Sequence, residues 1–262
     1  MAFGGGASPL LSSFHNAEIP TWPLSSSVPL VLPLAAALAA RMLCVADGSD
    51  MMGSLRNPAA WNNVYGFRPT WGLVPSEAEG DTFLHQLATS GPMARSPKDL
   101  AALLETQSGP DPRQPHGRPK ASLVNGIEAD VKGRKIGWLG DWGGAYPMEA
   151  GIMDACRAGL GEMETLGIEV DDVAAPFEAS AIWESWITLR SWAVAGGAGA
   201  LHANPKTKAM LKPAAIWEIE RGLSMSANEV YKANQTRTAW FKATAEMDMF
   251  ALPSAQLFPF PA

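Results

Sequence analysis

Residues 135–170 decide the fold, and they read KIGWLGDWGGAYPMEAGIMDACRAGLGEMETLGIEV. The opening residues 135–139 are largely apolar and predict a buried strand. The apolar positions of a helix follow at four- and three-residue spacings: Ile152, Cys156, Leu160 and Met163. Gly167 ends this helix, and residues 168–170 form the next predicted strand. Strand, helix and strand in this order form a βαβ unit, so we predict an α/β fold whose parallel or mixed β-sheet is covered by helices.

Further elements are predicted on both sides of this unit. An alanine-rich helix is expected over about residues 34–43, and Ser96 followed by proline marks the start of another helix. Two apolar faces at helical spacing lie in residues 182–193 and 216–223. A short buried strand is expected at 250–253. The elements after residue 170 are therefore expected to be mostly helical.

The composition is that of a globular protein with an acidic surface. The 262 residues are 47% hydrophobic and 18% charged, with a net charge of −6, which does not favour nucleic acid or an anionic membrane as a partner. The uncharged run 28–40 is shorter than the roughly 20 residues that a membrane helix needs. With only two cysteines, the simplest location is a reducing cytoplasm. Four widely separated histidines do not suggest a metal site.

The first 33 residues differ from the rest of the chain. They are rich in Gly, Ser, Pro and Leu and follow neither the helical nor the strand period. We expect residues 1–33 to be disordered or irregular and residues 34–262 to form one domain.

Chemistry is suggested by residues 46–60, which read ADGSDMMGSLRNPAA. We expect a loop at 47–56 and strand and turn structure at 57–75. A serine after glycine, among small residues, can present its hydroxyl to a substrate while backbone N–H groups point into the same space. By itself the pattern is equally that of a solvated turn.

Four motifs resemble the amidase signature family: residues 46–50, 53–59, 66–70 and 91–96. The resemblance implies an α/β/α layered fold around a mixed sheet, and cleavage or transfer of carbon–nitrogen bonds in small-molecule amides without a cofactor. It implies that Ser54 is the nucleophile and that the backbone N–H groups of Met51, Met52, Gly53 and Ser54 form the oxyanion hole. Asp50 and Arg56 match a charged pair that supports this loop.

The chain also departs from that family. The family passes the serine proton through a second serine to an upstream lysine, whereas the first lysine here is Lys98 and residues 28–34 read VPLVLPL. Met52 replaces a glycine whose backbone freedom a side chain would penalise. The family is about twice as long, so we expect a chain truncated at both ends, with a possible shift of reading frame before residue 35. An inactive remnant and a subunit of a tRNA-dependent amidotransferase are the alternatives, and a homo-oligomer is compatible with the sequence.

Overall fold

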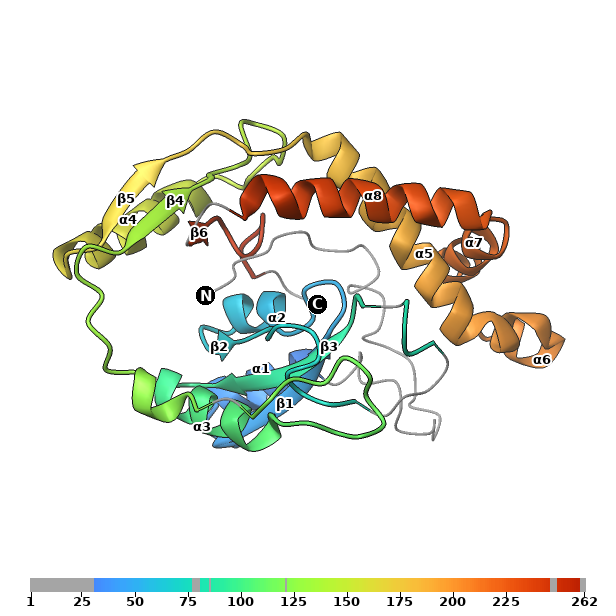
Figure 1. Ribbon diagram of the computed structural model, residues 1–262, viewed down its shortest axis with the longest axis horizontal. Coiled ribbons are helices and arrows are strands. Elements are labelled where there is room, and N and C mark those ends of the chain that lie inside the picture. The colour runs from blue at the N-terminus through green and yellow to red at the C-terminus, as the bar shows by residue number, and fades with distance from the viewer. Residues whose placement is uncertain (1–30, 77–80, 85, 121, 246–248, 260–262) are drawn as a thin grey trace. The chain divides into compact units, whose positions relative to one another are not determined.

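Helices and strands alternate along the chain in a computed structural model that describes residues 31–76, 81–84, 86–120, 122–245 and 249–259 (Figure 1). Its elements are α1 (Val31–Ala39), β1 (Val45–Asp50), α2 (Arg56–Trp61), β2 (Tyr65–Gly66), β3 (Thr89–Ala94), α3 (Pro97–Gln107), the 3₁₀ turn η1 (Val124–Gly126), β4 (Lys135–Trp138), α4 (Ile152–Thr165), β5 (Glu169–Asp172), α5 (Ala179–Ala203), α6 (Pro205–Lys208), α7 (Pro213–Leu223), α8 (Ala227–Thr244) and β6 (Phe250–Ala251). The described residues fall into two units, one within Met1–Val173 and Met249–Ala262, the other within Ala174–Asp248. The predicted α/β class is confirmed.

The βαβ unit predicted from residues 135–170 is present in the first unit. Strand β4 pairs in parallel with β5 on one side and with β6 on the other, giving the order β5-β4-β6. Helix α4 packs its Leu160 with Ile136 and Trp138 of β4 and with Ala251 of β6 in one buried cluster. The short strand expected at 250–253 is therefore confirmed as the third member of this sheet.

A second sheet in the same unit is antiparallel, with the order β1-β3-β2. The loop expected at 47–56 is wrong in its first half, because strand β1 continues to Asp50. Gly48 lets β1 pack closely, since a Cβ there would lie 3.0 Å from Val31 and 3.2 Å from Leu55. Glycine thus marks a close approach and not a loop here.

Helix α2 occupies residues for which strand and turn structure was expected. It runs through Arg56-Asn57-Pro58, and proline is tolerated in the first turn of a helix, where its missing N–H has no partner to lose. Asn57, Pro58 and Ala59 are all buried. The expectation for 57–75 is therefore wrong over this helix.

Helix α1 begins at Val31, three residues before the predicted start, so the last residues of the segment expected to be irregular are helical. Residues 1–30 lie outside the described residues. Val31, Ala35 and Leu38 are buried and form a core cluster together with Ala46, Leu55 and Met93. This cluster joins α1 to β1, to β3 and to the residue that follows Ser54.

The second unit is helical, as expected from the faces in residues 182–193 and 216–223. Helix α5 packs against both α7 and α8. The Ser185 hydroxyl of α5 donates a hydrogen bond of 2.7 Å to the carbonyl oxygen of Ala233 in α8. None of the helices in the described ranges has the length and apolarity that would let it cross a membrane.

Candidate active site

The loop between β1 and α2 carries the predicted nucleophile. Gly53 has φ +97°, a left-handed conformation that favours glycine, and a Cβ there would lie 3.0 Å from the Asn57 side chain. The Asn57 side chain is fully buried beneath this turn. Ser54 follows directly and is 5% exposed. The loop can therefore turn sharply into α2 only with glycine before the serine.

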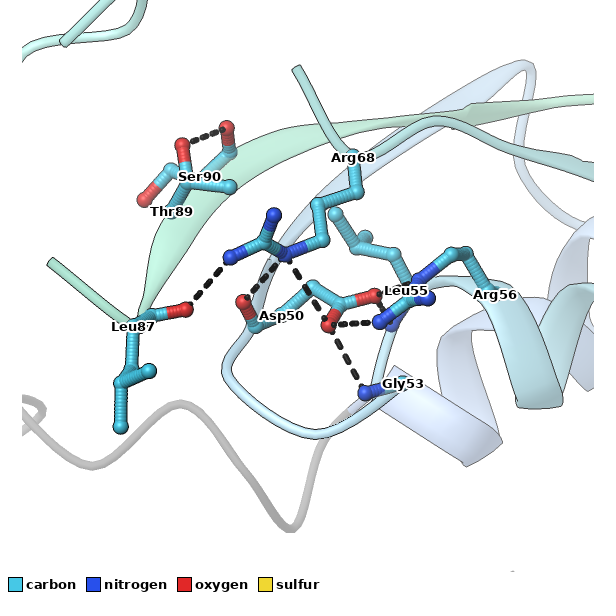
Figure 2. Close-up of polar contacts among 8 residues, drawn as sticks. All are labelled: Asp50, Gly53, Leu55, Arg56, Arg68, Leu87, Thr89 and Ser90. Atoms are coloured by element: carbon cyan, nitrogen blue, oxygen red, sulfur yellow. Dashed lines mark hydrogen bonds and ion pairs between the residues drawn. The ribbon is translucent and has the colours of Figure 1, made fainter. Parts of the chain in front are cut away.

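The Asp50 carboxylate is the centre of this loop, and Figure 2 shows the groups that converge on it. Its Oδ1 accepts a hydrogen bond of 2.8 Å from the Gly53 amide, and its Oδ2 accepts one of 3.3 Å from the Leu55 amide. Arg56 donates from Nε at 2.8 Å and from Nη2 at 2.9 Å, one bond to each carboxylate oxygen. The predicted ion pair between Asp50 and Arg56 is confirmed.

These contacts decide the protonation of a carboxylate that has no exposed surface. Burial by itself raises the pKa of Asp50, but the hydrogen bond and charge of Arg56, the Gly53 amide and the charge of Arg68 together outweigh it. The pKa of Asp50 therefore lies below its usual value of 3.8, and the carboxylate stays ionised at neutral pH.

The four N–H groups predicted for the oxyanion hole are not equivalent in the structure. The Gly53 amide donates to Asp50 and is therefore engaged inside the loop. Met51 and Met52 are half-buried, and Gly53 and Ser54 are buried. The amides of Met51, Met52 and Ser54 are thus the better candidates to reach a substrate oxygen.

Met52 does not carry the strain expected of a side chain at a glycine position. The left-handed angle falls on Gly53, whereas Met52 has a negative φ. The expected backbone penalty is therefore absent at Met52, and its remaining effect is the volume of its side chain.

Arg68, which follows β2, is a site residue that was not predicted from the sequence. Its Nε lies 3.5 Å from Asp50 Oδ1 and donates a hydrogen bond of 3.3 Å to the Asp50 carbonyl oxygen. Its Nη2 donates to the Leu87 carbonyl oxygen at 2.6 Å. The signal in the sequence was its place inside the motif at residues 66–70, but nothing there pairs it with Asp50, 18 residues earlier.

The first lysine of the chain lies at the other end of the antiparallel sheet. Asp50 pairs with Thr89 where the Ser54 loop begins, whereas Val45 pairs with Ala94, after which α3 and Lys98 follow. Five residue steps along an antiparallel strand span about 17 Å. Lys98 is therefore poorly placed to take a proton from Ser54. Across the described chain, no three His, Cys, Asp or Glu side chains gather as a metal ion would require.

Comparison with known proteins agrees with this loop. The family model described as Amidase matches residues 34–261, and the chain belongs to that family. An acylamidase of Rhodococcus erythropolis is 31% identical over 173 residues, which cover 65% of this chain and 35% of that protein. The glutamyl-tRNA(Gln) amidotransferase of Pseudomonas aeruginosa has one subunit that is 35% identical over 144 residues, 54% of this chain and 29% of the relative.

Solved structures show the same relationship. A bacterial aryl acylamidase of the amidase signature family superposes with a TM-score of 0.79 at 25% identity, covering 86% of this chain and 49% of that one. The 6-aminohexanoate cyclic dimer hydrolase, with a TM-score of 0.70 and 24% identity, shares the fold over 81% of this chain and 46% of its own. The chain thus spans about a third of these curated relatives and about half of these solved structures.

Proposed function

We propose that this chain carries the nucleophile loop of an amidase, a cytoplasmic enzyme that cleaves carbon–nitrogen bonds in small-molecule amides without a cofactor. Ser54 is the nucleophile, and the amides of Met51 and Met52 receive the negative charge that develops on the substrate oxygen. The observation that carries this proposal is the buried Asp50 carboxylate, which binds the amides on both sides of Ser54, those of Gly53 and Leu55.

The reaction follows from the geometry of this loop. The Ser54 Oγ attacks the amide carbonyl carbon and loses its proton, and the C–N bond breaks when the leaving nitrogen gains a proton. Water then hydrolyses the acyl-serine and regenerates the hydroxyl. The clamp on Asp50 keeps the loop amides from rearranging as charge develops, which is the condition for oxyanion stabilisation.

An inactive remnant is the alternative that a specific observation favours. A serine hydroxyl needs a base within hydrogen-bond reach, and the first lysine, Lys98, follows the end of the sheet far from Ser54. Membership of a larger amidotransferase is supported only by the names of relatives that this chain matches over 29% of their length. In that case partner chains would be required for activity.

Acylation by an activated ester separates these possibilities. Phenolate leaves 4-nitrophenyl acetate without needing a proton, so a correctly built loop needs less help from a base. We expect one acetyl group per chain, located on Ser54 by peptide mass spectrometry, and no such adduct in Ser54→Ala. Ser224→Ala, in the helical unit, is the matched control and should acylate like the parent. Equal labelling of the parent and Ser54→Ala would contradict the proposed nucleophile.

A further inference from the structure

The backbone around Arg68 is fixed against β3, so its side chain starts from a rigid position. The Phe67 amide donates a hydrogen bond of 3.0 Å to the Pro92 carbonyl oxygen, and Pro69 is fully buried. A Cβ on Gly91 would lie only 2.3 Å from the Phe67 carbonyl oxygen. The segment that carries Arg68 therefore lies directly on the strand.

From this position the Arg68 guanidinium joins two main-chain oxygens, as Figure 2 shows. Nε donates to the Asp50 carbonyl oxygen at 3.3 Å and Nη2 to that of Leu87 at 2.6 Å. Asp50 and Thr89 pair directly across the ladder, and Leu87 lies two residues before Thr89. Arg68 thus closes the end of the β1–β3 pair at which the Ser54 loop begins.

The bond to the Asp50 carbonyl oxygen has a consequence for the next amide. That oxygen belongs to the same peptide group as the Met51 N–H, and this peptide is trans, so the two groups point in opposite directions. A cation that binds the oxygen fixes the plane of the peptide and strengthens its N–H as a donor. We infer that Arg68 is a positioning residue for the oxyanion hole, acting through the Asp50–Met51 peptide.

The role of Arg56 is different, because its hydrogen bonds to Asp50 go to the two carboxylate oxygens. With Asp50 ionised, Arg56 and Arg68 together leave one net positive charge beneath the loop. Such a charge favours an anion over a neutral carbonyl at the same place. This inference rests on the proposed function, because it assigns the Met51 amide to the substrate oxygen.

The test uses phenylboronic acid, whose boron adds to a serine oxygen to give a tetrahedral boronate anion as the serine proton passes to solvent. Arg68→Met removes both bonds, and Arg68→Lys keeps the charge but loses the fork that reaches two oxygens. Arg95→Met is the matched control, because Arg95 also donates to two carbonyl oxygens, those of Leu38 and Leu43, near the other end of β3. Affinity is measured by titration calorimetry, and the adduct is identified by ¹¹B NMR.

A second readout follows the Met51 amide directly. In protein labelled with ¹⁵N-methionine, its signal is assigned with Met51→Leu. We expect Arg68→Met to weaken boronate binding at least about tenfold, since one lost oxyanion donor costs about 10²–10³-fold in rate, and to move the Met51 signal upfield. Added guanidinium should restore part of the affinity to Arg68→Met, because Arg68 is 29% exposed and the vacated site opens to solvent. Arg95→Met should change neither readout.

Equal affinity in Arg68→Met and the parent, or an equal loss in Arg95→Met, would overturn the inference. If Ser54→Ala binds the boronate as tightly as the parent, the proposed function fails instead. The position of the Met51 signal then decides the role of Arg68 by itself, and an unmoved signal in Arg68→Met would refute it.

Discussion

A carboxylate without exposed surface persists at the end of β1 because two backbone amides and two arginines reach it. Each donor comes from a different place: the turn, the start of α2 and the segment after β2. The Asp50 side chain thus links three pieces of chain around one serine. Removing the carboxylate charge leaves both arginines without their common partner, which is more costly than loss of an exposed pair.

We expect Asp50→Asn to destabilise the first unit by about 3 kcal/mol at pH 7, the loss typical of breaking a buried ion pair on one side. Because the pKa of Asp50 is lowered in the folded state, its contribution is present above the usual value of 3.8 and is lost as the pH falls through the folded-state value. Urea unfolding of parent and variant from pH 7 to pH 3 should therefore show a difference that shrinks with acidity.

Asp171→Asn serves as the control for this pH dependence, because Asp171 is exposed on β5. Its substitution should change the free energy of unfolding little at any pH. A gap between parent and Asp50→Asn that widens below pH 4 would contradict the assigned charge state.

At the scale of elements, local signals predicted structure well wherever the determining contact lies within a few residues. Ser96 caps α3 as expected, with its Oγ accepting from the Asp99 amide at 3.1 Å. The β4-α4-β5 unit was also predictable, because its period and its closing glycine are local. By contrast, β1 and the charged cluster depend on partners that the chain supplies 18 to about 45 residues away, and no local pattern shows such pairing.

We expect Ser96→Ala to cost about 1 kcal/mol, because the Asp99 amide loses its partner at the start of α3. Thr106→Ala in the same helix is the control. Its hydroxyl is exposed and bonds the Ala102 carbonyl oxygen, so alanine should be neutral or stabilise by a few tenths of a kcal/mol. Chemical denaturation measures both variants, and equal losses would show that the cap contributes nothing.

Helices α5 and α7 share a second buried charge pair, Arg190 with Glu218, exposed by 5% and 4%. The Arg190 Nη2 donates to Glu218 Oε2 at 2.9 Å. We expect Glu218→Gln to lower the free energy of unfolding by about 3 kcal/mol, because Arg190 stays buried beside a neutral group. The double variant Arg190→Met/Glu218→Leu should recover most of this loss.

The exposed pair Lys135–Glu169, at 3.3 Å, is the control for that comparison. Glu169→Gln should change stability by less than about 1 kcal/mol, as for most exposed ion pairs. If Glu218→Gln is equally mild, the interior of the helical unit must be more accessible to water than the exposures of Arg190 and Glu218 indicate.

At the scale of the whole molecule, the chain holds the nucleophile loop and spans about a third of the curated relatives and half of the solved structures described above. The division into residues 1–33 and 34–262 stays a prediction, and so do the oxyanion roles of Met51, Met52 and Gly53. The loop resists rearrangement through contacts within one unit. What it lacks is a base, and that deficit belongs to the chain as a whole.

We therefore expect amide hydrolysis by the purified chain to stay near background, within about tenfold of Ser54→Ala, because general-base catalysis alone contributes about 10²–10⁴-fold and relay residues act as a unit. The measurement is product release from a panel of small aryl and alkyl amides, with Ser224→Ala as control. Amides need protonation of the leaving nitrogen, whereas 4-nitrophenyl acetate does not, so the chain can be acylated by the ester and still fail with every amide. Robust amide turnover that disappears in Ser54→Ala would contradict this expectation and require another base within reach of Ser54.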